Sequence, residues 1–145
     1  MINQAMIFAA GLGKRMLPLT HSIPKPLVKV NDYSLLENSI EKLLKLNFDK
    51  IVVNSFHLSD QIIDTTARFG SKVEVVVEET RLETGGGLLN CLIKGKLNKK
   101  FPIILINGDI YWEDINYSSI SKLLEKWDNQ KMDIIMCMEE KKIFF

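Results

Sequence analysis

The sequence predicts an α/β protein in which helices cover both faces of a mostly parallel sheet. Short apolar runs alternate with amphipathic stretches of helical periodicity along the chain, and this βαβα order builds parallel sheets. The apolar runs show little polar alternation, which is typical of strands buried on both faces. The arrangement is Rossmann-like. A length of 145 residues fits one domain, so we expect residues 1–145 to form a single unit.

The first element is a strand over residues 5–10, whose six residues are all apolar. A loop rich in Gly and Pro follows over residues 11–31. Ser34 then serves as an N-cap, with Glu37 three residues later in capping-box spacing. Leucines and isoleucines recur at helical spacing over residues 35–46, so the first helix is expected there.

The middle of the chain repeats this alternation. Residues 51–53 predict the second strand, and an amphipathic helix is expected within residues 59–69, ended by Gly70. The valine-rich run at residues 73–77 predicts the third strand.

The last elements follow the same order. We expect a helix over residues 84–93 with glycines in its first turn, and a strand over residues 101–106 with Pro102 near its start. A fourth helix is expected over residues 120–127. A fifth strand is expected over residues 133–138, with its methionines in the core.

Composition excludes several classes of function. Lys and Arg number 19 against 18 Asp and Glu, so a net charge of +1 offers no basic field for nucleic acid. No apolar run approaches the roughly 20 residues of a membrane span, and the N-terminus has no basic leader, so we expect a cytoplasmic protein that does not bind membranes. Cys91 and Cys137 are too far apart for a CxxC pair and too few for a disulfide framework or a zinc site; we expect buried free thiols in a reducing compartment.

The loop after the first strand carries residues suited to phosphate. Ligands of parallel sheets bind at the carboxyl ends of the strands, and the glycines of residues 11–13 allow backbone amides to approach an anion. Lys14 and Arg15 lie beside them. The loop is neither a Walker A motif nor a dinucleotide fingerprint, since Met16 stands where a third glycine is needed and Pro18 disfavours a helix. A simple flexible turn is the alternative.

Four further residues lie near predicted strand ends. Lys25 stands between two prolines that restrict its backbone, although a solvated surface lysine is the alternative. Asp109 offers a hard carboxylate suited to Mg²⁺, or else a turn residue. His57 is best interpreted as a packed or capping residue, and Trp112 either lines the site or packs in the core.

These residues together resemble a known family. Residues 9–20 (AAGLGKRMLPLT) and 24–27 (PKPL) are similar to the signature of the sugar-1-phosphate nucleotidyltransferases. The segments at 83–87 (ETGGG) and 107–109 (NGD) most resemble the N-acetylmuramate 1-phosphate uridylyltransferases of peptidoglycan recycling, and next the mannose- and heptose-1-phosphate guanylyltransferases. The resemblance spans residues 5–127. It implies transfer of a nucleoside monophosphate from a triphosphate, UTP before GTP, to a sugar 1-phosphate with release of pyrophosphate.

The resemblance also implies a role for each matching residue. Gly13 would let the loop close over the triphosphate, and Arg15 would neutralise the pyrophosphate leaving group. Lys25 would hold the phosphates, and Asp109 would ligate Mg²⁺ as the cofactor. The residues implied to frame the base and ribose are Ala9, Ala10, Gly11, Glu83, Gly85 and Gly86. No general base is expected, because a sugar phosphate is already a competent nucleophile.

The chain departs from the family in length. Family members continue well beyond 145 residues, and the resemblance implies that their second half supplies the acceptor pocket and a second carboxylate for the metal. We therefore expect the N-terminal part of such a fold, which binds nucleotide but catalyses its turnover poorly. A fragment that binds only nucleotide or a partner chain is the alternative. Glu139 and Glu140 are best interpreted as solvated. The apolar residues 143–145 predict an interrupted strand and a homo-oligomer through that edge.

Overall fold

The computed structural model describes residues 3–113 and 118–138. The chain divides after Trp112 into two compact units. The first contains the sheets and three of the helices, and the second contains α4 (Ser118–Lys126). The expectation of a single domain over residues 1–145 stays a prediction.

A four-stranded parallel sheet forms the centre of the first unit, in the order β5-β4-β1-β6. Its strands are β1 (Gln4–Phe8), β4 (Lys50–Ser55), β5 (Val73–Val77) and β6 (Ile104–Asn107). From β1 the chain moves outward to β4 and β5 and then returns to the other side of β1 to form β6. The strand order therefore reverses at β1, which is where parallel sheets bind ligands. The predicted α/β class and parallel sheet are confirmed.

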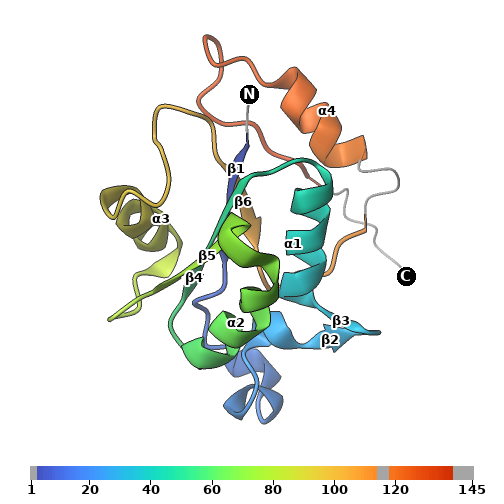
Figure 1. Cartoon of the computed structure of the whole chain (residues 1–145), viewed down its shortest axis with the longest axis vertical. Helices are drawn as coiled ribbons and strands as arrows, with labels where there is room; N and C mark the ends of the chain where they lie inside the picture. The colour runs from blue at the N-terminus through green and yellow to red at the C-terminus, as the bar shows by residue number, and fades with distance from the viewer. Residues whose placement is uncertain (1–2, 114–117, 139–145) are drawn as a thin grey trace, which may run out of the picture. The chain divides into compact units, whose positions relative to one another are not determined.

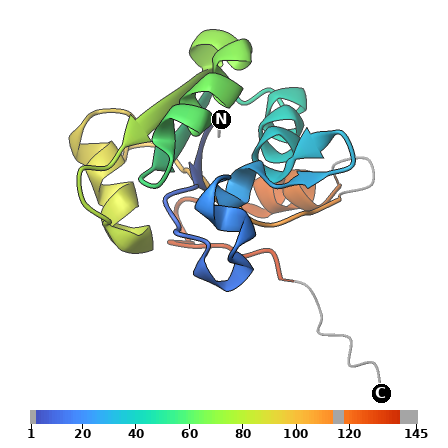
Figure 2. The same cartoon turned by 90° about the horizontal axis from the view of Figure 1, so that it is seen from below.

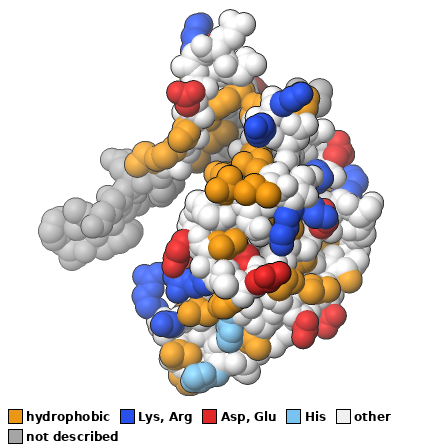
Figure 3. Space-filling view, turned by 90° about the vertical axis from the view of Figure 1, so that its left-hand side faces the viewer, with side chains coloured by type: hydrophobic (Ala, Val, Ile, Leu, Met, Phe, Trp, Pro, Cys, Tyr) orange, Lys and Arg blue, Asp and Glu red, His pale blue; other side chains and the backbone are white. Residues whose placement is uncertain are grey.

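Helices cover both faces of this sheet (Figure 1). The helices α1 (Leu35–Lys45) and α2 (Ser59–Thr66) lie on one side, and α3 (Glu83–Ile93) lies on the other. The core cluster on the α3 side contains Met6, Val52, Val76, Cys91 and Leu97. Figure 3 looks onto the side that carries α3 and shows hydrophobic side chains at the surface there; Leu89 and Ile93 of this helix are 56% and 76% exposed.

Short turns replace a helix between β1 and α1, and they appear in blue in Figure 2. Prolines interrupt this segment, and a proline removes a backbone donor that a helix interior needs. The elements are the 3-10 turns η1 (Lys14–Met16), η2 (Leu19–His21) and η3 (Lys25–Leu27), followed by the antiparallel pair β2 (Lys29–Val30) and β3 (Tyr33–Ser34). The segment thus folds back on itself beside the end of β1.

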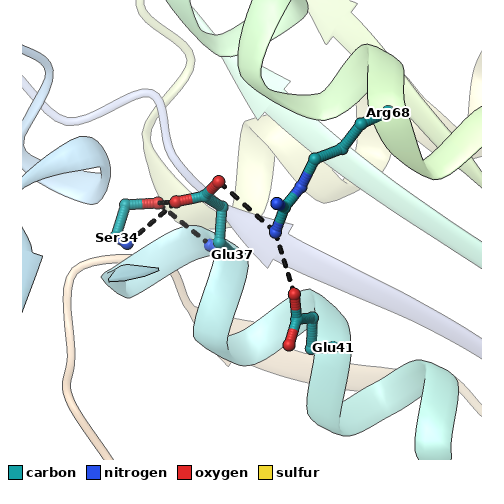
Figure 4. Close-up of polar contacts among 4 residues, drawn as sticks. All are labelled: Ser34, Glu37, Glu41 and Arg68. Carbon is teal, nitrogen blue, oxygen red and sulfur yellow. Dashed lines mark hydrogen bonds and ion pairs between the residues drawn. The ribbon is translucent and has the colours of Figure 1, made fainter. Parts of the chain in front are cut away.

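The start of α1 confirms the predicted capping box. The Ser34 hydroxyl accepts a hydrogen bond from the Glu37 backbone N–H at 3.2 Å, and the Glu37 carboxylate accepts from the Ser34 N–H at 2.9 Å. Arg68, from η4 (Ala67–Lys72), forms ion pairs with Glu37 at 3.4 Å and with Glu41 at 2.8 Å (Figure 4). The arginine therefore ties the segment after α2 to the first turns of α1.

Most element boundaries differ from expectation by one or two residues, and two differ by three. The helix expected within residues 59–69 ends as an α-helix at Thr66, and η4 continues to Lys72 across Gly70, which has a φ of +63°. The strand expected over residues 101–106 begins only at Ile104. Gly70 still marks the break, because its left-handed backbone cannot continue a helix.

The prediction of a fifth strand over residues 133–138 is wrong. The structure shows no strand there, and Ile134, Met136 and Met138 are 77%, 68% and 79% exposed. The expectation that these methionines fill core is wrong for the same reason: an apolar run becomes a buried strand only when another strand pairs with it. The predicted interrupted strand at residues 143–145, with Glu139 and Glu140, lies outside the described residues.

Candidate functional site

A cavity of about 360 Å³ opens at the carboxyl edge of the sheet, beside the end of β1. This is the point where the strand order reverses. Its walls are residues 8–16, Lys25, Pro26, Asn54, Arg81, Glu83, Thr84, Asn107 and Asp109. The loop after β1, η3, the start of α3 and the end of β6 therefore meet around one space.

Most of the residues singled out in the sequence lie in this cavity. Those that line it are Ala9, Ala10, Gly11, Gly13, Arg15, Lys25, Glu83 and Asp109. Gly85 and Gly86 are not among the lining residues; they follow Glu83 and Thr84 in the first turn of α3. Residues about 70 to 100 positions apart in the chain are thus brought together by the parallel sheet.

Gly13 fixes the shape of the loop after β1. Its φ is +63°, and a Cβ at this position would lie 2.8 Å from Thr20 Cγ2 and 3.2 Å from Lys25 Cβ. The buried Thr20 hydroxyl donates to the Gly13 carbonyl at 2.9 Å. His57 Nε2 lies 3.2 Å from the Thr20 carbonyl and does not line the cavity, so it packs against the loop from the end of β4, as a packed histidine was expected to do.

Lys25 and Asp109 form an ion pair inside the cavity. Lys25 Nζ lies 2.5 Å from Asp109 Oδ2, and the two side chains are 23% and 38% exposed. Gly108 makes this approach possible: its N–H donates to the Phe8 carbonyl at 2.8 Å, and an added Cβ would lie only 2.8 Å from that oxygen. The backbone after β6 therefore lies tightly against the end of β1 and directs Asp109 toward the lysine.

The charges of the cavity suit a polyphosphate with a divalent cation. Lys14, Arg15 and Lys25 line it together with Asp109. Over residues 3–113 and 118–138, no group of three or more His, Cys, Asp or Glu side chains could hold a metal. Asp109 nevertheless fits Mg²⁺, because that ion is commonly held by one or two carboxylates and completes its shell with substrate phosphates and water.

Sequence reasoning missed Asn54 and Glu78. Both are buried, and the Asn54 amide nitrogen donates to Glu78 Oε1 at 2.7 Å. Asn54 Oδ1 accepts from the Ala9 N–H at 2.9 Å. Two features of the sequence could have indicated them: Asn54 is a polar residue inside an apolar strand, and Glu78 directly follows the apolar strand over residues 73–77. Polar side chains buried at such positions need hydrogen-bond partners.

Glu83 begins α3 with a left-handed backbone. Its φ is +57°, and its carboxylate lies 2.5 Å from Arg81. Such a φ is uncommon for a residue other than glycine. It directs the chain from the loop after β5 into the helix along the wall of the cavity.

Trp112 packs on α1 and does not line the cavity. Its indole N–H donates to Ser39 Oγ at 3.0 Å, and Lys42 Nζ lies 4.4 Å from the ring centroid. Of the two interpretations left open by the sequence, the packing aromatic is the one observed.

Cys91 is buried and Cys137 is exposed, and both are free thiols, so the expectation of burial fails for Cys137. Burial, and then the charge of Glu78, raises the pKa of the Cys91 thiol. Within the described residues, no helix combines the length and apolar character needed to cross a bilayer.

Comparison with known proteins identifies the family of this chain. The family model for nucleotidyl transferases matches residues 4–142. N-acetylmuramate alpha-1-phosphate uridylyltransferase from Caulobacter vibrioides is 30% identical over 140 residues, which cover 92% of this chain and 57% of that protein. The protein of the same name from Neisseria meningitidis serogroup B is 35% identical over 120 residues, covering 80% and 50% of the two chains.

A solved structure is similar as well. The crystal structure of HddC from Yersinia pseudotuberculosis superposes with a TM-score of 0.68 at 30% identity, covering 86% of this chain and 55% of that one. The chain spans about half the length of the curated relatives it matches. Because the family match extends over nearly the whole sequence, and the glycine loop, Lys25 and Asp109 meet in one cavity, the chain belongs to the nucleotidyl transferase family.

Proposed function

We propose that this protein acts in the transfer of a nucleoside monophosphate from a nucleoside triphosphate to a sugar 1-phosphate, with release of pyrophosphate. The observation that carries the proposal is the convergence of Gly13, Arg15, Lys25 and Asp109 on one cavity where the strand order reverses. The names of the relatives from Caulobacter vibrioides and Neisseria meningitidis support UTP as the donor and N-acetylmuramate 1-phosphate as the acceptor. GTP is the second candidate donor. This chemistry would belong to nucleotide-sugar metabolism and peptidoglycan recycling.

The cavity offers separate places for the two parts of the triphosphate. The base and ribose would lie between Ala9, Ala10 and Gly11 on one side and Glu83 on the other. The phosphates would follow the loop toward Arg15 and Lys25, where positive charge is concentrated. Gly85 and Gly86 would contribute by allowing the first turn of α3 to stand close behind the base.

The reaction needs positioning and charge compensation from the protein. A phosphate oxygen of the sugar 1-phosphate attacks the α-phosphorus in line, a new P–O bond forms, and the bond from the α-phosphorus to the bridging oxygen breaks. Pyrophosphate leaves with that oxygen, and Arg15 and Lys25 stabilise the charge that develops on it. Bound Mg²⁺ would supply further neutralisation of the phosphates, and Asp109 is the residue that would hold it.

The test is pyrophosphate release with two substrate pairs, UTP with N-acetylmuramate 1-phosphate and GTP with mannose 1-phosphate. We expect the first pair to react faster. We expect UTP to bind but to be turned over slowly, because a misplacement of about 1 Å can cost ~10²-fold in rate. The family resemblance places the acceptor pocket in the part of the relatives that this match does not cover. A monomer that turned over either pair at about 10 s⁻¹, near the enzyme median, would contradict that second expectation.

A second candidate function is nucleotide binding without turnover. It is favoured by one observation, the coverage of only 57% and 50% of the two relatives' lengths. A thermal shift with UTP and Mg²⁺ but no pyrophosphate release would support this candidate. If UTP causes no thermal shift and no pyrophosphate is released, the result would favour a chain that only binds a protein partner.

We also propose a cytoplasmic location, where nucleoside triphosphates are available and thiols such as Cys91 and Cys137 stay reduced. Self-association is proposed as the means of covering exposed apolar side chains such as Ile93 and Leu105. Cell fractionation and light scattering test these two points.

A further inference from the structure

We propose that the buried Asn54–Glu78 pair is a positioning device that sets the spacing between the two walls of the base and ribose site. This inference rests on the function proposed above, because it assigns those walls to the nucleotide. It concerns side chains that would hold the site open at one width and would themselves not carry the chemistry.

The pair links two walls through an unbroken series of hydrogen bonds. The Ala9 N–H, at the end of β1, donates to Asn54 Oδ1 at 2.9 Å. The Asn54 amide nitrogen donates to Glu78 Oε1 at 2.7 Å. The Leu82 N–H, immediately before α3, donates to Glu78 Oε2 at 3.1 Å. Ala9 therefore reaches the residue next to Glu83 through two side chains.

The hydrogen bonds of the series require one order of donors and acceptors. Both ends are backbone N–H donors, so the connecting side chains must present an acceptor to each end and one donor between them. An amide on Asn54 and a carboxylate on Glu78 satisfy this requirement with every contact used. If one carboxylate oxygen of Glu78 is replaced by a donor, that donor faces another N–H group, and one hydrogen bond of the series is lost.

Burial makes this arrangement stringent. Asn54 and Glu78 are 2% and 3% exposed. Burying a carboxylate destabilises the folded state unless hydrogen bonds compensate for the lost water. Even a fully hydrogen-bonded buried pair adds little net stability, because apolar side chains of similar size often stabilise a fold equally well. Their position between the pocket walls accounts better for this pair than stability does.

Gly87 shows that α3 is seated directly on the pair. A Cβ at Gly87 would lie 2.7 Å from the Asn54 amide nitrogen and 2.8 Å from Glu78 Oε1. The third glycine of the triplet therefore has a role distinct from the framing of the base and ribose proposed for Gly85 and Gly86: it allows the helix to approach the pair. The start of α3 is therefore fixed at two points: Gly87 packs against the pair, and the Leu82 N–H donates to Glu78.

The test exchanges the acid and the amide. In Glu78→Gln one link must break, because the new amide nitrogen faces either the Asn54 amide or the Leu82 N–H. In the double variant Asn54→Asp/Glu78→Gln the carboxylate of residue 54 accepts from Ala9 and from the new amide, while the amide oxygen of residue 78 accepts from Leu82. The double variant restores the series with the same net charge.

Affinities for UTP and for inorganic tripolyphosphate, both with Mg²⁺, give the readout. The single variant should bind UTP about tenfold more weakly, with tripolyphosphate affinity little changed, because only the base and ribose walls move. The double variant should recover UTP affinity. Thr66→Val is the control: it removes a buried hydroxyl in α2 that donates to the Ile62 carbonyl at 2.9 Å. Thr66 does not line the cavity, so UTP and tripolyphosphate affinities should keep their ratio.

Three results would overturn the inference alone: parent-like UTP binding by the single variant, equal losses for UTP and tripolyphosphate, or a folded double variant that does not recover. A parent protein that binds neither UTP nor tripolyphosphate would contradict the proposed function, and the inference with it. The two failures are therefore distinguishable.

Discussion

Gly13 combines two constraints that can be separated by experiment. It has a left-handed backbone, with φ at +63°, and it lies against Thr20 with no room for a Cβ. Gly13→Ala should therefore lower the free energy of unfolding by more than the ~1–2 kcal/mol that a left-handed backbone costs alanine, because Thr20 and Lys25 must also move. It should also weaken UTP binding. Chemical denaturation and a UTP titration measure the two effects.

Gly95 provides the matched control for this substitution. Its φ is +66°, a Cβ there would meet nothing within 4 Å, and it does not line the cavity. Its N–H donates to the Leu92 carbonyl and the Lys96 N–H donates to the Cys91 carbonyl, the bonds of a left-handed helix C-cap. Gly95→Ala should show only the backbone cost and leave UTP affinity unchanged. Equal losses of stability in the two variants would show that the contact with Thr20 is unimportant.

Asp109 tests whether the ion pair in the cavity belongs to a metal site. Asp109→Asn keeps the shape of the side chain and removes its charge, so the part of UTP affinity that depends on Mg²⁺ should shrink. Stability should change little, because the carboxylate is 38% exposed and exposed ion pairs contribute little. UTP titrations with and without Mg²⁺ measure the first effect. A sharp fall in melting temperature with intact Mg²⁺ dependence would instead indicate a structural turn residue.

At the scale of elements, the start of α1 makes stability depend on pH. Burial raises the pKa of Glu37, but hydrogen bonds from Ser34 and the charges of Arg68 and Lys29 outweigh it, so the pKa is lowered from 4.5. A lowered pKa means that the stabilisation is present above the unfolded value and is lost as the pH falls through the folded value. Glu37→Gln should therefore flatten the acid side of the stability curve. Parallel curves for parent and variant would contradict this.

The glycines of α3 should respond differently to alanine. Gly87→Ala should destabilise the protein, because its Cβ would lie within 2.8 Å of both the Asn54 amide nitrogen and Glu78 Oε1. Gly85→Ala meets nothing within 4 Å and should hold or raise the melting temperature, since alanine favours a helix by about 0.5–1 kcal/mol over glycine. Thermal denaturation of both variants decides this. A similar change in both would show that α3 can shift away from the pair.

The contrast between elements shows what could be predicted from the sequence. The capping box at Ser34 was predictable because its bonds join residues three positions apart. The strand over residues 133–138 was wrong because pairing depends on a distant partner, which an apolar run does not specify. The Asn54–Glu78 bond spans 24 residues and was invisible to local patterns. Lys25 and Asp109 were predicted from the flanking prolines and from the end of a predicted strand, and then from the family signature, whereas their 2.5 Å contact required the fold.

At the scale of the whole molecule, the parallel sheet turns distant segments into one site. The strand order β5-β4-β1-β6 places the ends of β1, β4 and β6 side by side. The loop over residues 9–16 follows β1, Asn54 lies at the end of β4, and Asp109 follows β6, and all of them line the cavity. The central claim is that this cavity binds the phosphates of a nucleoside triphosphate through cationic side chains presented by two of its loops.

Titration calorimetry of UTP with Mg²⁺ into the parent, Arg15→Ala and Lys25→Ala tests this claim most directly. Both positions line the cavity. Each substitution should weaken binding by about 1.5–3 kcal/mol, the scale of a hydrogen bond to a charged group, while the melting temperature without ligand changes little. If both variants bound UTP as tightly as the parent, the assignment of this cavity to the triphosphate would be contradicted.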